Sequence, residues 1–239
     1  MSIIKIQCCF RKFIARRELK KNKIFKKSIL GYHLLNENPI KETDWEDIQE
    51  NILKKVGIKV LNSAKGSHKS GKDIETNHFS YSNKTSKIEN KNFFSISSYR
   101  LTSITTTNKL GKIDEIIKFI NEKKNFDKYS ILLREEKTDY ITYYWIELPA
   151  NFFYMEPINY EWKLVKGKIL RNRDIYVGWE TNQINNNSMK IVFSMSSQLW
   201  INLDFSVINE FIKCRINANR NTFNSLTLDD FYDKFISFS

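Results

Sequence analysis

The chain of 239 residues is 41% hydrophobic and 14% aromatic, which supplies apolar material for one substantial core and excludes an intrinsically disordered protein. Lysine and arginine number 39 against 27 aspartates and glutamates, and the formal net charge of +12 favours a polyanionic partner. No apolar run approaches the roughly 20 residues that cross a bilayer, no secretory leader is visible, and Cys8, Cys9 and Cys214 lack the pairing of a zinc site or disulfide framework, so we expect a soluble intracellular protein.

Residues 2–28 are predicted to form a basic helix with an apolar stripe. Its sequence places an aliphatic residue and a glutamine before spaced basic residues and a closing apolar residue: Ile6, Gln7, Arg11, Arg16 and Leu19. The segment from Ile6 to Leu19 therefore resembles the calmodulin-binding IQ motif, with Lys12 where that motif usually has glycine. Three interpretations stay open, because a basic amphipathic helix can bind a calmodulin-like protein, follow a phosphate backbone, or pack on the main domain.

A second helix is predicted over residues 44–56, with an apolar face and Asp44 as a plausible cap. The face consists of Trp45, Ile48, Ile52 and Val56. Glu46 and Glu50 lie one turn apart on this helix, and either side chain can bring a carboxylate to a neighbouring site, although both also fit a solvated helix surface.

The segment from Gly66 to Lys84 is the most informative part of the chain. A basic, turn-rich loop delivers Asp73, and a strand-like run then places Ser82 and Lys84 on one face, because side chains alternate along a strand. Phosphodiester hydrolysis needs a hard cation, an activated water and stabilisation of negative charge. A carboxylate beside a lysine meets these needs, whereas the competing interpretation is a solvated loop and an ordinary amphipathic strand.

These residues resemble the PD-(D/E)xK nuclease superfamily, in particular type II restriction endonucleases, over residues 45–105. No proline precedes Asp73, and Ser82 stands where the family usually has a carboxylate. The resemblance implies that Asp73 binds Mg²⁺, that Lys84 positions water, and that Glu75 or a helical glutamate such as Glu50 completes the ligands. It also implies a mixed sheet flanked by helices and a homodimer that cuts double-stranded DNA.

Two other segments of the sequence contain an acidic residue followed by any residue and a lysine, as the nuclease motif requires. Asp127 with Glu135 and Lys137 ranks second, because the last two fall in an expected hairpin turn, which is a poor support for a metal site. Glu161 with Lys163 ranks third, because no acidic residue stands at a convenient distance before it.

The remaining elements predict a mixed fold and a strand-rich carboxyl-terminal part. A strand over 93–101 is expected beside the site, followed by a helix over 112–124, strands over 129–133, 140–148, 162–169, 175–179 and 189–193, and a continuation of the last strand over 194–200. Polar and basic side chains in these segments and in the loop are candidates for DNA contact. They are Lys69, Arg100, Arg171, Arg173, Gln183, Ser196, Ser197 and Gln198, and Ser97 and Ser98 are expected with Arg100 beside the site.

The sequence as a whole predicts an α/β or α+β fold with a mixed central sheet flanked by helices. We expect residues 1–27 to form the IQ-like helix and residues 28–239 a nuclease-like domain whose recognition part spans about residues 150–239. The expected function is Mg²⁺-dependent, site-specific cleavage of double-stranded DNA. The alternatives are a non-catalytic nucleic-acid-binding protein regulated by a calmodulin-like partner, and an adaptor that acts through its amino-terminal helix alone.

Overall fold

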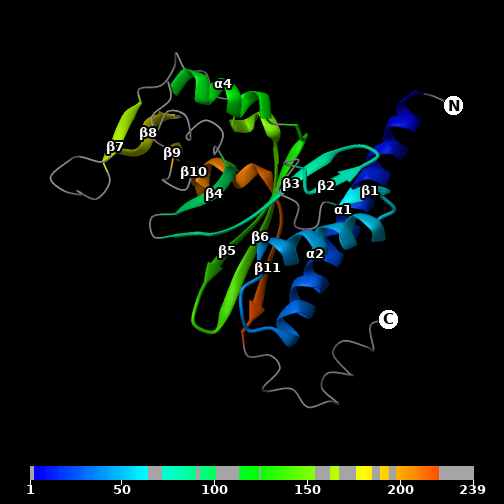
Figure 1. The fold of residues 1–239 in the computed structure, drawn as a ribbon. Helices are drawn as coiled ribbons and strands as arrows, with labels where there is room; N and C mark the ends of the chain where they lie inside the picture. The colour runs from blue at the N-terminus through cyan, green and yellow to red at the C-terminus, as the bar shows by residue number, and fades with distance from the viewer. Residues whose placement is uncertain are drawn as a thin grey trace.

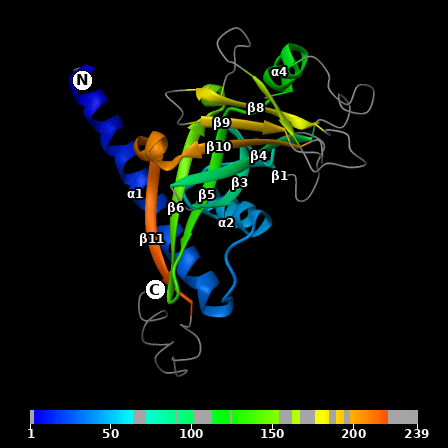
Figure 2. The ribbon, with the colours of Figure 1, turned by 90° about the vertical axis from the view of Figure 1, so that its left-hand side faces the viewer.

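The structure, a computed structural model, describes residues 3–63, 72–89, 92–100, 113–123, 125–153, 162–166, 176–184, 189–193 and 198–220. Two helices lie against one face of a mixed sheet, and a second sheet with a further helix covers the opposite face (Figure 1 and Figure 2). The predicted α+β fold with a mixed sheet flanked by helices is therefore confirmed.

The first sheet has six strands in the order β1-β2-β3-β5-β6-β11. Their bounds are β1 Val60–Ser63, β2 Ile74–Thr76, β3 Ser80–Lys87, β5 Lys128–Glu136, β6 Tyr140–Pro149 and β11 Ile212–Asn219. All neighbours are antiparallel except β3 and β5, which are parallel. A parallel pair needs a long crossover, and the helix α4 (Ile113–Lys123) lies in the chain between these two strands.

The second sheet is antiparallel, with the order β4-β10-β9-β8-β7. Its strands are β4 Phe93–Arg100, β7 Lys163–Lys166, β8 Tyr176–Ile184, β9 Met189–Phe193 and β10 Gln198–Asp204, and the short helices η1 (Ala150–Phe153) and η3 (Phe205–Phe211) join the two sheets. The second sheet takes β4 from the first half of the chain, while β11 returns to the first sheet. The two sheets therefore do not correspond to successive parts of the sequence.

Alternation along β5 and β6 builds the core on both faces of the first sheet. Ile131 and Ile146 face the second sheet and α4, where they pack with buried residues such as Ile201. Leu132 and Trp145 point to the opposite face and pack against the two helices. Because both faces are buried, these strands are nearly continuous hydrophobic runs, as expected for a sheet at the centre of three layers.

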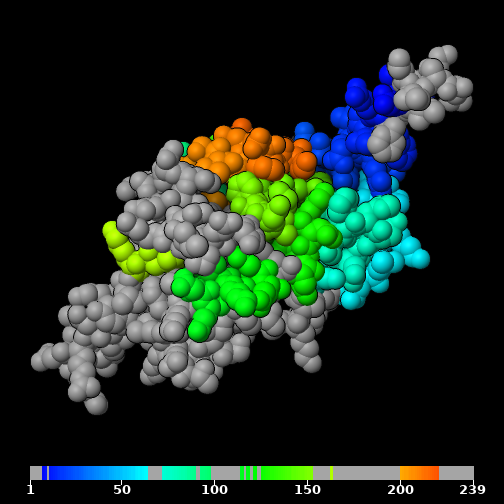
Figure 3. Space-filling view, turned by 90° about the horizontal axis from the view of Figure 1, so that it is seen from above, coloured from blue at the N-terminus to red at the C-terminus, as the bar shows by residue number. Residues whose placement is uncertain are grey.

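The helix α1 (Ile3–Leu35) divides into an exposed half and a packed half. Phe13 and Leu19 are 61% and 69% exposed, and this half of the helix projects from the rest of the molecule (Figure 1 and Figure 3). Phe25 and Ile29, further along, are completely buried against the first sheet. The packed half explains why the helix continues to Leu35, past the predicted end near residue 28, because its apolar run covers the core.

The helix α2 (Glu42–Lys55) lies on the same face as α1 and is fixed by a buried tryptophan. The Trp45 ring packs edge-on against Phe25 and Trp145, with centroids 6.0 and 5.8 Å away. Its indole Nε1 donates to the Ser130 carbonyl at 3.1 Å, which satisfies the one polar atom of the ring. The position of α2 over β3 and β5 is therefore determined by packing in the core.

The link between α1 and α2 is held by a buried hydrogen-bond chain. His33 Nδ1 lies 2.9 Å from the Asn36 carbonyl, which can only accept, so Nδ1 carries the proton and Nε2 accepts from the Tyr143 hydroxyl at 2.8 Å. That hydroxyl in turn accepts from the Ile40 amide at 3.1 Å. Burial lowers the pKa of His33, which keeps the ring neutral in this chain. These hydrogen bonds fix the position at which α2 begins.

Most predicted elements are confirmed, and two placements differ from the prediction. The second predicted helix begins at Glu42 instead of residue 44, and the strands over 93–101, 129–133 and 140–148 correspond to β4, β5 and β6. Residues 198–200 were expected to continue the strand 189–193, but they begin β10, which pairs with β9 in antiparallel register, and residues 194–197 lie outside the described residues. The strand β4 was expected beside β3. Its start lies beside the end of β3, where Ser86 and Ser95 are hydrogen-bonded, but in the sheets β3 lies between β2 and β5, and β4 pairs with β10.

Candidate functional site

Asp73 lies where β2 begins, at an open edge of β3. The two strands pair only at Ile74 with Tyr81 and at Glu75 with Ser80, so the amides of β3 beyond Tyr81 have no strand partner on this side. The Asp73 carboxylate takes that place, because its Oδ2 accepts from the Asn83 amide at 2.5 Å. Local backbone geometry therefore fixes this carboxylate without any ligand.

Ser82 and Lys84 point to the same carboxylate from β3. The Ser82 hydroxyl donates to Asp73 Oδ2 at 3.3 Å, and Lys84 Nζ lies 3.9 Å from that oxygen. Lys84 is 9% exposed, and its ammonium also donates to the Asn83 carbonyl and to Glu42 Oε1, the latter at 2.9 Å. The structure therefore brings Asp73, Ser82 and Lys84 together. Their metal-binding and catalytic roles stay predictions.

Two carboxylates of α2 join this group. Glu42 and Glu46 lie one helical turn apart, so both face β3 from the first half of the helix. Burial raises the pKa of Glu46 to about 7, and the nearby charges of Asp73 and Glu42 add to this effect. Burial likewise raises the pKa of Asp73, although Lys84 and the Asn83 amide oppose it. We call Glu42, Glu46, Asp73, Ser82 and Lys84 the acidic cluster.

The acidic cluster has three carboxylates around one ammonium and is therefore short of positive charge. Among the residues that the structure describes, no three acidic, histidine or cysteine side chains stand ready to enclose a metal ion. Mg²⁺ does not need such a cage, because it keeps several waters and takes one or two carboxylates. Oxygen donors with excess negative charge fit the chemistry of Mg²⁺, and Asp73 with one glutamate of α2 are the side chains that would hold such an ion.

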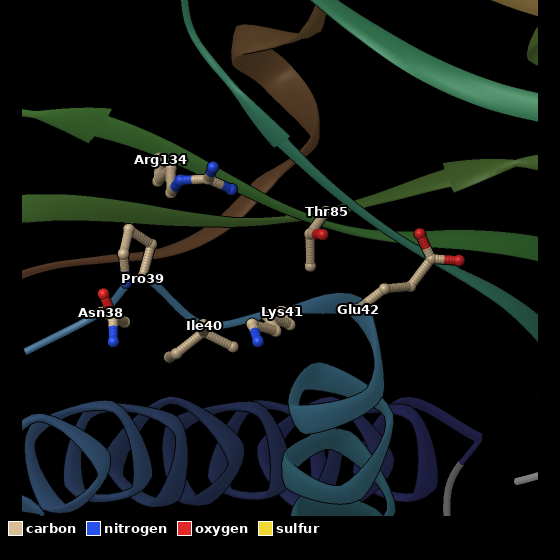
Figure 4. A pocket seen from close by; sticks show the side chains of 7 residues that line it. All are labelled: Asn38, Pro39, Ile40, Lys41, Glu42, Thr85 and Arg134. Carbon is tan, nitrogen blue, oxygen red and sulfur yellow. The ribbon is translucent and has the colours of Figure 1, made fainter. Parts of the chain in front are cut away.

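A cavity of about 460 Å³ borders the acidic cluster at Glu42. The segment 38–42 forms one wall, and Thr85 of β3 and Arg134 of β5 form the other (Figure 4). Lys41 and Arg134 give the cavity two cations. Its volume lies within the range of about 300–1,000 Å³ that is typical of small-ligand sites. A phosphate-bearing group in this cavity would therefore lie next to Glu42 and Lys84.

Behind the acidic cluster, Gln49 and Asn83 are completely buried. All four polar atoms of their side chains lack a hydrogen-bond partner in the described part of the chain. Such groups cost free energy unless ordered water satisfies them, and they are uncommon in a core that serves stability alone. Their position between α2 and β3 makes the region behind the acidic cluster polar.

The other predicted metal ligands pair with lysines. Glu75 lies 3.5 Å from Lys72, and Glu50 lies 2.5 Å from Lys54. Their role as ligands stays a prediction. Glu42 was not among the predicted site residues, because the predicted helix begins after it. The signal was available, since Glu42 and Glu46 have the same spacing as Glu46 and Glu50.

The second-ranked site does not assemble. Asp127 comes directly before β5 and holds the Ser80 amide and hydroxyl at 2.7 and 2.8 Å, and these hydrogen bonds lower its pKa. Glu135 and Lys137 lie at the far end of the same strand, where they pair with each other at 2.6 Å. At about 3.3 Å per residue, the strand separates them from Asp127 by roughly 26 Å. For the third-ranked site, Lys163 begins β7 and Glu161 lies outside the described residues.

The predicted DNA contacts fall mainly on the second sheet or outside the described residues. Arg100 ends β4 opposite Gln198, the first residue of β10, and Gln183 lies in β8. Because β4 belongs to the second sheet but meets β3 at Ser86 and Ser95, the expectation that Ser97, Ser98 and Arg100 flank the site stays a prediction. The candidates outside the described residues are Lys69, Arg171, Arg173, Ser196 and Ser197.

Comparison with known proteins identifies one motif. Residues 1–20 match the family model of the IQ calmodulin-binding motif, which confirms the predicted resemblance of this segment and supports a calmodulin-like partner. Comparisons with curated proteins and with solved structures gave no match. None of the helices in the described residues has the length and apolar character of a membrane-spanning helix.

Proposed function

We propose that this protein is a metal-dependent DNA nuclease that is bound through α1 by a calmodulin-like partner. The observation that carries the proposal is the acidic cluster, in which Asp73, Glu42 and Lys84 are linked by ion pairs of 2.9 and 3.9 Å. The net charge of +12 suits a polyanionic substrate. Carboxylates for a divalent cation and a lysine for developing charge are the groups that phosphodiester hydrolysis needs.

Asp73, together with Glu42 or Glu46, would hold Mg²⁺. The ion, when bound, lowers the pKa of a water and stabilises charge on the phosphate. The contacts of Asp73 all fall on Oδ2, whereas its Oδ1 has no hydrogen bond in the described part of the chain. The Asn83 amide and the Ser82 hydroxyl therefore orient the carboxylate and leave one oxygen for a ligand. In this role Ser82 would take the place of the carboxylate that PD-(D/E)xK nucleases usually carry there.

Lys84 would stabilise the charge of the phosphate, and Glu46 would give and take protons. The Lys84 ammonium donates to Glu42 at 2.9 Å, and an arriving phosphate would compete for the same donor. A carboxyl group with a pKa of about 7, such as that of Glu46, can both give and take a proton near neutral pH. Simultaneous cleavage of both strands of a duplex would take two acidic clusters, and for this reason we propose a homodimer.

The direct test is incubation of the purified protein with supercoiled plasmid DNA in Mg²⁺ and in EDTA. We expect nicked and linear DNA in Mg²⁺ only, and loss of cleavage in Asp73→Asn, which keeps the size of the side chain but removes its charge. Glu122→Gln on α4 is the matched control, since it changes the net charge equally at a distant position. Equal cleavage by Asp73→Asn and the wild type would refute the proposed site.

A second candidate function is non-catalytic nucleic-acid binding regulated by the same partner. It is favoured by the net charge of +12, because basic side chains supply affinity for nucleic acid without any catalytic group. In that case DNA would bind in EDTA and remain intact under several divalent cations. The two functions are separated when binding of the plasmid DNA in EDTA and its cleavage in divalent cations are both measured.

A further inference from the structure

A second cavity, of about 360 Å³, lies away from the acidic cluster, where α1 leaves the domain. It is enclosed by α1, by the turn between β2 and β3, and by β5, β6 and β11, and these segments meet on the face that Figure 3 shows. We call it the basic cavity and define it by six of its lining residues: Arg17, Glu18, Phe79, Lys128, Glu147 and Lys213.

The charges of the basic cavity do not balance. Its two carboxylates are already paired, Glu18 with Lys21 at 2.8 Å and Glu147 with Lys128 at 3.7 Å. In the part of the chain that the structure describes, Arg17 and Lys213 form no ion pair. Two cations without a carboxylate thus line one cavity, and an anion is the ligand that completes them.

Two polar atoms of the lining are buried and lack a partner. Arg17 Nε has no hydrogen-bond acceptor, and Glu147 Oε1 has no donor, among the described residues. Each would gain from a ligand that supplies the complementary group. The ligand therefore carries an anionic acceptor for Arg17 and also a neutral donor, such as a sugar hydroxyl or a base amino group, for Glu147.

An aromatic ring stands beside these groups. Phe79 is 44% exposed, and the Lys128 ammonium lies over one side of its ring at 4.0 Å from the centroid. Proteins that hold unpaired nucleic-acid strands combine a basic groove with exposed aromatic rings on which bases stack. The basic cavity provides this combination, whereas a duplex would keep its bases away from the ring.

We propose that the basic cavity binds one nucleotide of an unpaired nucleic-acid strand, with its phosphate at Arg17 and Lys213 and its base on Phe79. This site goes beyond the proposed nuclease activity and does not depend on it, because no residue of the acidic cluster takes part. The calmodulin-like partner would compete for the site, since Arg17 belongs to the segment that matches the IQ motif.

The test measures fluorescence anisotropy of labelled oligothymidylate, about twelve nucleotides long, with the full chain in EDTA, where cleavage cannot interfere. We expect the double variant Arg17→Ala/Lys213→Ala to bind roughly tenfold more weakly or worse, and Phe79→Leu, which keeps an apolar side chain but loses the flat ring, to bind roughly fivefold more weakly. Lys54→Ala/Lys118→Ala is the control, because it removes the same charge from exposed lysines elsewhere.

Two results would overturn the proposal. One is that the Arg17→Ala/Lys213→Ala variant and the control lose the same affinity for oligothymidylate, which would reduce the effect to net charge. The other is that this variant keeps its affinity for oligothymidylate but loses calmodulin, which would assign the cavity to the partner protein. Circular dichroism of each variant checks that it is folded. Failure of plasmid cleavage would leave the proposal unaffected.

Discussion

At the scale of single residues, the crowded carboxylates of the acidic cluster make the stability of the protein depend on pH. The pKa of Glu46 is raised from 4.5 to about 7, chiefly by burial. The folded state therefore keeps the proton to a higher pH than the unfolded chain does. This contribution to stability is complete below about pH 4.5 and is lost as the pH rises through 7.

We predict that Glu46→Gln removes this loss. Without metal, the free energy of unfolding of the wild type should fall by about 1–2 kcal/mol more than that of Glu46→Gln between about pH 5 and about pH 8, after allowance for solvent screening of a half-buried group. Urea denaturation at the two pH values measures this difference in the free energy of unfolding. Glu122 is an exposed residue of α4 that pairs with Lys118, and Glu122→Gln should behave as the wild type. Identical losses of stability in all three proteins would contradict the prediction.

Gln49 offers a second prediction at this scale. Its buried amide has no partner in the described part of the chain, so Gln49→Met, of similar volume, should raise the free energy of unfolding by about 1 kcal/mol. Thermal unfolding of the two proteins is the measurement. A destabilised Gln49→Met would show instead that bound water satisfies the amide.

Sequence reasoning reached part of the acidic cluster because strand alternation is a local rule. It placed Ser82 and Lys84 on one face, and both do contact Asp73. Glu42 was not predicted, because its contact with Lys84 spans 42 residues and depends on where α2 begins. That start is fixed by the contact of His33 with Tyr143, which are 110 residues apart. The hydrogen bond of the Lys41 amide to Asp44 and the four-residue spacing of Glu42 and Glu46 are local, but no local pattern contains the contact of Lys84 with Glu42.

At the scale of elements, α1 combines an exposed half and a packed half in one continuous helix. The residues that match the IQ motif lie in its projecting half, where Phe13, Ile14 and Leu19 are exposed. A helix-binding groove needs this accessibility, so the helix is available to a partner without unfolding of the domain. The packed half joins the core and, through the bond of Tyr32 to Asp44 at 3.2 Å, touches the first turn of α2.

A pair of substitutions separates the two halves. Leu19→Ala should weaken binding of calmodulin in a pull-down while changing the free energy of unfolding by less than about 0.5 kcal/mol, because the side chain is exposed. Phe25→Ala should cost about 3–5 kcal/mol of stability, because this ring is completely buried. If Leu19→Ala unfolds the protein, or calmodulin fails to bind the wild type, this division of α1 is wrong.

Element types were predictable where periodicity is strong, as in α2 and β6. Their arrangement was not. The parallel pairing of β3 with β5 requires a crossover through α4, and β4 leaves its neighbour β3 to join β10, about a hundred residues later in the chain. Hydrophobic patterns specify which face of a strand is buried, but they do not specify which strand lies beside it.

At the scale of the whole molecule, the net charge of +12 predicts salt-dependent affinity for nucleic acid. Binding of a short DNA duplex in EDTA should weaken roughly tenfold or more between about 50 and about 200 mM salt, because each phosphate contact releases counterions. Anisotropy at several salt concentrations gives the slope. An affinity that does not change with salt would contradict a role for the basic surface in binding.

We propose above all that Lys84 acts in cleavage as part of the acidic cluster, and a comparison of Lys84→Ala with Lys87→Ala tests this role. Both lysines lie on β3 and both substitutions remove one charge, but Lys87 pairs with Glu136 at 3.2 Å and not with the acidic cluster. In Mg²⁺, Lys84→Ala should cleave plasmid DNA about a hundredfold more slowly or not at all, while binding duplex DNA in EDTA as tightly as Lys87→Ala, which should cleave like the wild type. A folded Lys84→Ala that cleaves as fast as Lys87→Ala would contradict the claim.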